Sequence, residues 1–316
     1  MNVNGSGTSI QFGLESVFKD GATPTTVINH SSEGVSVAVT KGDEGNLIGS
    51  KTAQTRDLMS VAVSGNVSFI LRPEFAGLLF HAVMGGADKV TTTGESTEHE
   101  FVLCEPREDL PSVCLVIDRS ASVKKYPGVT IGGLSLDATA GDYVKGSFDI
   151  KGTEENVGTV AVLPKLTIPS YRCTAAVCKI NGSIFDISSA SFKIDNALEE
   201  PPKTYATGLY VGQPSHGKRS VTVDFKIPYS KEVETFKNTY LTTETLADVE
   251  LVYTSTNSDY SLTLKMPNVS INTVSANIGG EGIIETSISG EALSVGATEP
   301  LTVVIKDKTT TAYGGV

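Results

Sequence analysis

The sequence predicts a mainly β protein made of two similar halves with one helix in each half. Short segments with alternating apolar and polar residues recur along the 316-residue chain, as is typical of half-buried strands. The composition of 31 glycines, no tryptophan and abundant Thr, Ser and Val also favours strands joined by turns. In addition, the order of predicted elements recurs after a shift of about 156 residues, which indicates an internal repeat.

The repeat is visible in two matched stretches. The segment VSFILRP at 67–73 leads into PEFAGLLFHAVMG, and VDFKIPY at 223–229 leads into SKEVETFKNTYL. Farther on, apolar or proline residues match in pairs: Pro127/Pro267, Val129/Val269, Ile131/Ile271, Leu134/Val274, Val144/Ile284 and Phe148/Ile288. We therefore predict an N-terminal arm (1–34), a first copy (35–152), a linker and hairpin (153–182), a second copy (183–292), and a C-terminal strand and tail (293–316).

The first copy begins with strands. Gly, Pro and Ser in the arm before it indicate an extended start with little core of its own. A short strand at 35–39 precedes a polar, glycine-rich segment, Lys41–Asp57, which is longer than an ordinary hairpin loop. The strand that follows, 59–71, places its apolar residues at alternate positions.

A helix then begins at Pro73, because proline fits the first helical turn. Its apolar stripe consists of Phe75, Leu78, Leu79, Ala82 and Val83, and Gly85-Gly86 ends it. A polar segment is predicted as far as about Glu100. Strands are predicted at 113–117, 128–136 and 143–150, and the last of these has one wet face formed by Tyr143, Lys145, Ser147 and Asp149.

The second copy follows the same plan. Asn181-Gly182 predicts a type I′ hairpin turn before a strand at 189–195. A second long polar loop spans Asn196–Arg219, and the strand at 220–227 leads into a helix at 229–241. Further strands are predicted at 248–254, 259–265, 268–277, 282–291 and 301–306. One helix cannot cover both faces of such a sheet, so we expect its exposed edges and faces to meet another copy or another chain.

The composition argues against several classes of function. The formal net charge of −11 and the scattered Lys and Arg argue against a nucleic-acid binder. No run of 18 apolar residues and no secretory signal are apparent, so we expect a cytoplasmic protein without a membrane span. The cysteines Cys104, Cys114, Cys173 and Cys178 have no CxxC spacing.

Catalytic signatures are also missing, and we expect no enzyme activity, no cofactor and no metal. No P-loop, dinucleotide fingerprint or nucleophile elbow occurs. His99, between Glu98 and Glu100, could hold a metal weakly, although a solvated loop is the simpler interpretation. Asp142 and Asp149 could pair as glycosidase carboxylates, but Asp149 belongs to a wet strand face. His81 is interpreted as a packed or half-exposed helix residue.

Four phrases resemble the tail tube proteins of long-tailed, siphovirus-like bacteriophages with duplicated tube domains. FGLESVFKDGATPTTVI is similar to the start of that group, and SGNVSFILRPEFAGLLFHAVMGG is similar to its strand-into-helix element. YPGVTIGGLSLDATAGDYVKGSFDIKGTEE and MPNVSINTVSANIGGEGIIETSISGEA resemble its terminal hairpin. The likeness extends over most of residues 10–292, whereas 153–182 and the tail after 293 carry no such phrase.

The resemblance implies a structural virion protein, assembled in the host bacterial cytoplasm, whose sheets join into a β-barrel lining the channel of a stacked-ring tube. Two domains per chain imply a ring of three chains with six domains. The implied partners are further copies of the chain, a tape-measure protein and tail-tip or terminator proteins, with DNA passing through unbound. The loops would contact a neighbouring subunit or the next ring; their candidate contact residues are Lys41, Asp43, Glu44, Lys51, Arg56, Glu199, Glu200, Pro201, Tyr205, Tyr210, Lys218 and Arg219.

Two other classes of protein remain open at this point. A neck, tail-terminator or decoration protein would share the phage origin but would form no tube. An Ig-like adhesin or surface module would also be β-rich and duplicated, but it would usually carry export signals and lack the matched helices.

Overall fold

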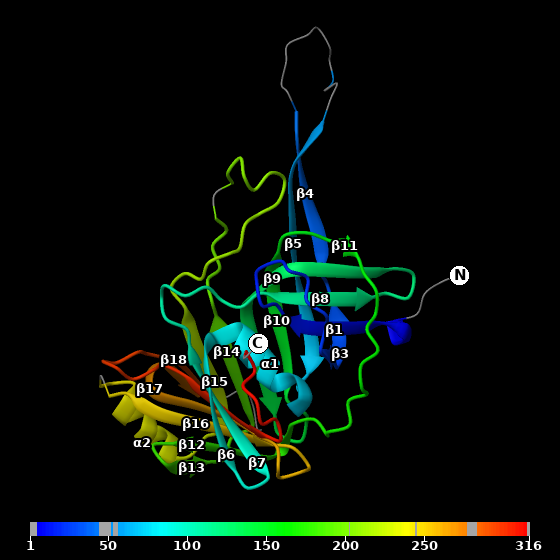
Figure 1. Cartoon of the computed structure of the whole chain (residues 1–316). Helices are drawn as coiled ribbons and strands as arrows, with labels where there is room; N and C mark the ends of the chain where they lie inside the picture. The colour runs from blue at the N-terminus through cyan, green and yellow to red at the C-terminus, as the bar shows by residue number, and fades with distance from the viewer. Residues whose placement is uncertain are drawn as a thin grey trace.

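Antiparallel strands dominate the computed structural model of the protein, which describes residues 5–43, 52, 56–201, 203–243, 245–276 and 283–314 (Figure 1). The predicted mainly β fold class is therefore confirmed. The helical elements of the described residues are η1 (Gly5–Gly7), α1 (Pro73–Met84) and α2 (Lys231–Tyr240). Both predicted helices are thus present.

The strands of the N-terminal part are β1 (Ser9–Leu14), β2 (Thr26–Ile28), β3 (His30–Glu33), β4 (Ser36–Gly42), β5 (Asp57–Ile70), β6 (Gly85–Thr93), β7 (Ser96–Leu103), β8 (Val113–Asp118), β9 (Val123–Thr139), β10 (Lys145–Gly152) and β11 (Asn156–Val157). Those of the C-terminal part are β12 (Arg172–Ile180), β13 (Ser183–Phe185), β14 (Ser189–Asp195), β15 (Ser220–Pro228), β16 (Ala247–Thr254), β17 (Ser261–Ala276), β18 (Glu285–Ala292) and β19 (Thr302–Asp307).

One antiparallel sheet, which we call the long sheet, runs through both halves of the chain. Its order is β3–β4, β5, β10, β9, β14, β15, β18, β17, where β3 and β4 both pair with β5 and together occupy one edge. The halves meet where β9 pairs with β14, with Leu134 opposite Ile194 and Leu136 opposite Phe192. The sheet of this single chain has two ends and is not a closed barrel.

Smaller sheets cover one face of the long sheet, and the long strands β9 and β17 lead into them. The first part of β9 pairs with β8, and β1 and β2 follow. The first part of β17 pairs with β16, and β12 and β13 follow. On its other side, β17 pairs with β19, β19 pairs with β7, and β7 pairs with β6.

The N-terminal segment contributes to the core. Ile10 and Phe12 of β1 are fully buried, and β1 lies between β2 and β8. The expectation that residues 1–34 have little core of their own is therefore wrong: Ile10, Phe12 and Leu14 alternate in SIQFGL, which is the pattern of a strand with one buried face. The polar stretch after α1 is likewise a hairpin, β6–β7, and not a loop.

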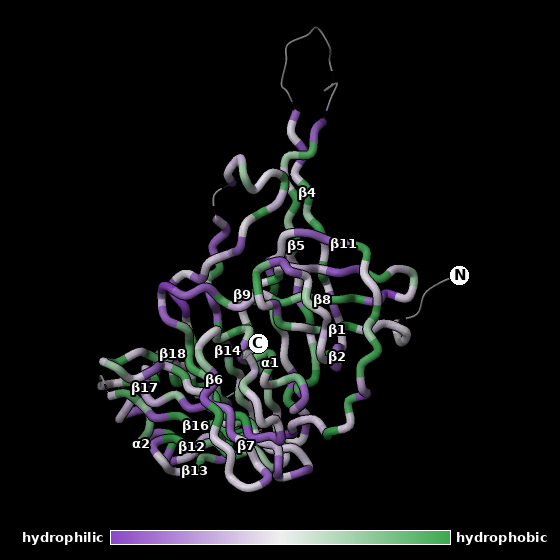
Figure 2. The backbone as a smooth tube through the Cα atoms, viewed as in Figure 1, coloured by the Kyte–Doolittle hydropathy of each residue, from purple (hydrophilic) through white to green (hydrophobic). Residues whose placement is uncertain are grey.

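Helix α1 packs between the two layers. Phe75 meets Phe69 of the long sheet and Phe12 of the covering sheet edge to face, at ring-centroid distances of 5.6 and 5.3 Å. Gly85 ends the helix in the left-handed conformation (φ 70°), as its sequence predicts. Figure 2, in which the trace is coloured by residue hydropathy, shows hydrophobic residues along α1 and the strands beside it. This helix therefore fills the main core of the first half.

The C-terminal strand joins the two halves a second time, since β19 pairs with β7 of the first half and β17 of the second. Buried His99 on β7 contacts two carboxylates: its Nδ1 lies 2.8 Å from Asp88 Oδ2, and its Nε2 lies 3.4 Å from Asp307 Oδ1. The Tyr313 amide donates to Asp88 and its hydroxyl to Asp307. These contacts anchor the tail, and Gly77 leaves the space that the Tyr313 ring occupies.

The proposed solvated-loop or weak-metal interpretation of His99 is thus wrong, because the EHE segment lies on a buried strand. Burial by itself would lower the pKa of His99, but hydrogen bonds with Asp307, Asp88 and the Thr309 carbonyl outweigh it and raise the pKa to about 10. His99 is therefore an imidazolium ion held by carboxylates at neutral pH.

We predict that substituting Phe75 with Ala lowers the free energy of unfolding by about 3–5 kcal/mol, as expected for removing a buried aromatic ring. Chemical denaturation measures this loss. Tyr143→Ala, at a half-exposed site, is the control and should change stability by less than about 0.5 kcal/mol. A loss below about 1 kcal/mol for Phe75→Ala would contradict the core described here.

Stability should also depend on the charge of His99. A raised folded-state pKa stabilises the fold fully below the unfolded value near 6.5, and this contribution disappears as the pH rises towards about 10. The thermal midpoint of the wild type should therefore fall across this interval. His99→Gln should be less stable at pH 6 and should lose most of that slope; an unchanged slope would rule out His99 as its source.

Candidate functional site

The long sheet has one apolar and one polar face. Residues of one parity pack on α1 and the covering sheets, whereas the other parity carries Ser, Thr, Lys and Asp, as predicted for the wet face of β10. In register across four neighbouring strands, Lys145 lies opposite Asp137, Asp137 opposite Ser191, and Ser191 opposite Asp224. The Ser191 hydroxyl donates to Asp137 at 2.7 Å. The polar face is continuous across the junction of the two halves.

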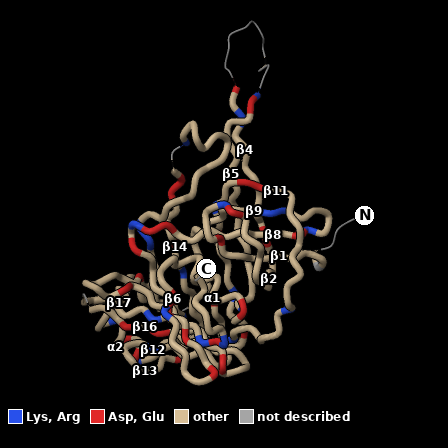
Figure 3. Tube along the Cα trace, viewed as in Figure 1, with Lys and Arg blue, Asp and Glu red and all other residues tan. Residues whose placement is uncertain are grey.

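The charges on this face are mixed, with a small acidic excess. The acidic residues are Asp137, Asp149, Asp195, Asp224, Glu285 and Glu291, and the basic residues are Lys145, Lys151, Lys193 and Lys226. Burial and the neighbouring Asp195 raise the pKa of Asp149. Asp142 pairs with Lys145 in the turn before β10, whereas Asp149 lies towards the other end of that strand, so the hypothetical Asp142–Asp149 glycosidase pair does not form a site. Figure 3 shows acidic and basic residues interspersed along the trace.

Both ends of the long sheet are unpaired along their outer side in the described part of the chain. At one end, β3–β4 pair with β5 on their inner side, and at the other end β17 pairs with β18 on its inner side. The outer side of β17 is open at residues 270–276, after Val269, which pairs with Ala247 of β16. The unpaired backbone amides and carbonyls on such edges can form hydrogen bonds with a strand of another chain. Open edges were expected from the number of strands and the single helix in each half, but the residue pattern does not show which strands form them.

The β4–β5 hairpin extends away from the body of the protein, and the 196–219 loop lies beside it (Figure 1). The Val61 amide donates to the Leu209 carbonyl at 2.9 Å, and Tyr210 bridges to Val61. We call this hairpin together with the loop the projecting arm. Two of the predicted contact segments are therefore joined into one structure.

The predicted contact residues fall into three groups. Lys41, Asp43 and Arg56 are exposed near the outer end of the hairpin, and Tyr205 is fully exposed on the loop. Glu44 and Lys51 lie outside the described residues. The remaining six residues lie at the base and on the inner part of the 196–219 loop. Four of them contact other residues of the chain, Pro201 is half-buried, and Lys218 is exposed; the four are Glu199, Glu200, Tyr210 and Arg219.

Several members of the last group support the fold. Glu199 exchanges backbone hydrogen bonds with Ser215, and Glu200 lies 3.9 Å from Lys151. Arg219 donates to the Met84 carbonyl at the end of α1 and to the Cys104 sulfur. The Tyr210 ring lies beneath the Lys19 ammonium group at 4.4 Å. Arg219 is therefore a poor candidate for a free contact residue.

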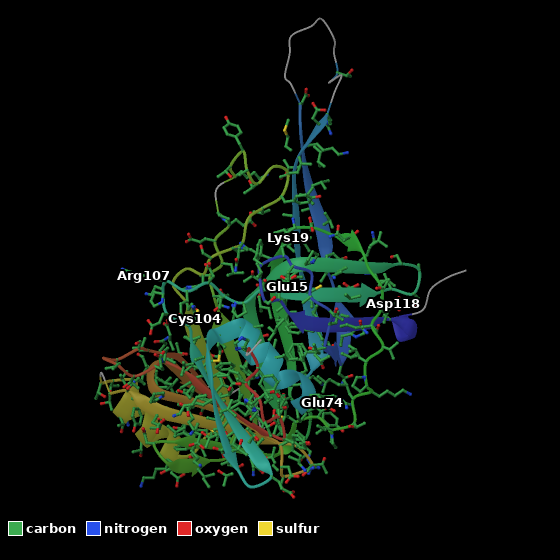
Figure 4. The ribbon with its side chains drawn as sticks, in the orientation of Figure 1. Glu15, Lys19, Glu74, Cys104, Arg107 and Asp118 are labelled. Carbon is green, nitrogen blue, oxygen red and sulfur yellow. The ribbon has the colours of Figure 1, made fainter. Side chains whose placement is uncertain are left out.

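Glu15 has a role that sequence reasoning missed. Its carboxylate accepts hydrogen bonds from the amides of Lys19, Gly21 and Gly128 and from the Ser112 hydroxyl. Figure 4 shows Glu15 and Lys19 together beside β8 and β9. The FGLES segment thus fixes the turn that follows β1. The only local signal in the sequence was an acidic residue directly after the alternating segment SIQFGL.

Glu74 fixes the linker in a similar way. At the start of α1 (Figure 4), its carboxylate accepts the amides of Thr167 and Ile168, while Arg72 donates to the Ile168 carbonyl. The linker is therefore held along the first half before it enters β12.

The described residues contain no group of three or more His, Cys, Asp or Glu that could hold a metal ion. In the same part of the chain, neither helix has the length and apolar character needed to span a membrane.

Comparison with known proteins gives one family. A family model described as phage tail tube protein matches residues 5–292, which include the long sheet, both helices and the projecting arm. No curated protein matches the chain significantly. Because the match extends over most of its length, the chain belongs to the phage tail tube protein family, whose members are structural components of virion tails.

Proposed function

We propose that the protein is the major tail tube subunit of a siphovirus-like phage, and that each chain supplies two tube domains to a ring. The observation that carries this proposal is the junction of β9 with β14, at which one half completes the sheet edge of the other. If the second half ends in an edge like that of β9, it would accept the next chain in the same way. The role requires no catalytic residue, cofactor or metal.

The strand pairings support an internal duplication. The order β3–β4, β5, β10, β9 is followed by β14, β15, β18, β17, and each group carries one helix between its second strand and the later ones. Register shifts also match: Gly132 is skipped in β9 and Asn272 in β17. Bulges persist within families, so matching bulges favour a common origin. When the two halves are aligned by these strand pairings, β1 corresponds to β12. The same alignment matches Val223 with Gly65, whereas the sequence repeat had matched Val223 with Val67, two residues farther along.

The junction also predicts how two chains would pair. Transferring the β9–β14 register to β17 and a neighbour's β3–β4 places Val274 opposite Val37 and Ser275 opposite Ser36. The Gly34 amide bonds to the Asn66 carbonyl, so in an antiparallel ladder the backbone groups of Val35 and Val37 face the open edge. Both edges therefore present complementary geometry.

The size of the resulting channel favours a ring of three chains, since each chain supplies eight strand positions to the barrel. About 24 strands, spaced by about 4.8 Å and tilted by about 40°, give a barrel roughly 50 Å across its backbone. Barrels of 16–18 strands already leave an aqueous channel. Six chains would roughly double the diameter.

The polar face would line that channel, because the opposite face is occupied by α1 and the covering sheets. Its acidic excess would repel phosphates and let DNA pass without binding. The projecting arm would contact the next ring, and tape-measure, tip and terminator proteins would contact the lumen or the ends of the tube. Assembly would take place in the bacterial cytoplasm before the tail joins the virion.

Engineered cysteines test the strand pairing. A variant with Ser36→Cys and Ser275→Cys should form intermolecular disulfides under assembly conditions, because the transferred register places these residues at a position without backbone hydrogen bonds, where Cβ atoms approach closely. Negative-stain microscopy should show rings or tubes, and mass measurement of a ring should give three chains.

The matched control pairs Ser36→Cys with Thr273→Cys, which is two residues out of register and should cross-link much more slowly. Equal yields from both pairs, or a ring mass of six chains, would overturn this arrangement.

A second prediction concerns the projecting arm. Tyr205→Ser should leave the thermal midpoint unchanged but reduce the length or yield of tubes, because an exposed aromatic side chain that becomes buried on stacking would be lost. Val162→Ser, at an equally exposed position of the linker, is the control. Tubes of normal length and yield from Tyr205→Ser would remove this residue from the inter-ring contact.

A further inference from the structure

An ion pair covers part of the open edge formed by β3 and β4. Glu33 and Arg119 form a bidentate contact, with Nε 2.7 Å from Oε1 and Nη2 3.0 Å from Oε2. Arg119 does not belong to the long sheet; it follows β8 in the covering sheet, and its guanidinium reaches the edge from there. Both side chains are partly buried, with exposed fractions of 20% for Glu33 and 32% for Arg119. Such a contact is stronger than an exposed ion pair.

This pair occupies both backbone groups of one edge residue. The Val35 amide donates to Glu33 Oε2 at 3.0 Å, and the Val35 carbonyl accepts from Arg119 Nη2 at 2.9 Å. These are the groups that face away from β5, because Gly34 next to Val35 bonds to Asn66 of β5. Arg119 is itself braced: its Nη1 donates to the Tyr126 hydroxyl, which donates to Glu155.

The occupied position is one that a neighbouring strand would need. In the β9–β14 junction, the residue corresponding to Val35 is Phe192, which lies opposite Leu136 in the middle of the ladder. The corresponding partner in a second copy is Ala276. The strand of the second copy and the ion pair therefore compete for the same amide and carbonyl.

We infer that Glu33 and Arg119 form an edge clamp that keeps the β3–β4 edge partly closed in the free chain and opens when β17 of a second copy pairs with it. This inference rests on the proposed strand pairing between chains. It gives the free chain a means of limiting uncontrolled edge-to-edge association, a hazard that open sheet edges create. The clamp leaves Val37 free to pair with Val274 of the second copy, but it delays the pairing of Val35 with Ala276 until the two strands are aligned.

The test measures the initial rate of intermolecular disulfide formation in the Ser36→Cys/Ser275→Cys chain, with and without Arg119→Ala. Removing the guanidinium should raise the rate by about tenfold, a factor in line with the loss of a hydrogen bond between charged and backbone groups. Added salt should raise the rate of the chain that retains Arg119 and leave that of Arg119→Ala nearly unchanged, because salt weakens only the ion pair.

Three further variants distinguish the clamp from a general loss of stability. Glu33→Gln should also accelerate cross-linking, and Arg119→Lys should have an intermediate effect because lysine keeps the charge without the planar fork. Lys308→Ala removes a remote exposed ion pair with Asp259 and should change nothing. Thermal unfolding checks that each variant is folded.

The outcomes separate the two proposals. Cross-linking that is equally fast or slower in folded Arg119→Ala and Glu33→Gln would overturn the clamp and leave the strand pairing intact. Absence of the in-register disulfide in every background would overturn the strand pairing itself, and the clamp with it.

Discussion

Unsatisfied backbone hydrogen bonds at the two ends of the long sheet are the constraint on which the rest of the account depends. Inside the chain, the same need is met where β9 and β14 exchange hydrogen bonds and so unite the halves. The outer side of β3–β4 and that of β17 at 270–276 have no such strand in the described residues. A protein with this architecture must either protect these edges or join them to further copies.

The fold has two layers, and they differ in what they contribute: the covering layer forms the core with the apolar face of the long sheet, and the long sheet carries the open edges and the polar face. Phe12, Phe69 and Phe75 hold the covering sheet and α1 on the apolar face, so these elements leave the polar face uncovered. The β19 strand and the charged His99 contact fix the halves relative to each other, so the angle of the junction does not depend on β9 and β14 alone. A rigid junction angle is what a closed ring of defined size requires.

Much of the fold could be predicted from sequence because its signals are local. The Pro73 and Gly85 boundaries of α1, the Asn181-Gly182 turn and the wet face of β10 follow from residue chemistry within a few positions. The core role of β1 and the buried position of His99 could not, since they depend on pairing with distant strands. The β6–β7 hairpin could not either, because the residues of β6 are mostly polar and exposed. The contact residues were chosen by loop composition, which does not show that Arg219 is held at the end of α1 or that Glu33 and Arg119 meet. The domain limits remain a prediction.

The most direct test of the central claim is a high-resolution reconstruction of the assembled particle. We predict an uninterrupted sheet around a channel, with β17 of each chain beside β3–β4 of the next, Val274 opposite Val37, and three chains per ring. A reconstruction in which the two edges stay apart, or in which the polar face is turned away from the channel, would contradict this account.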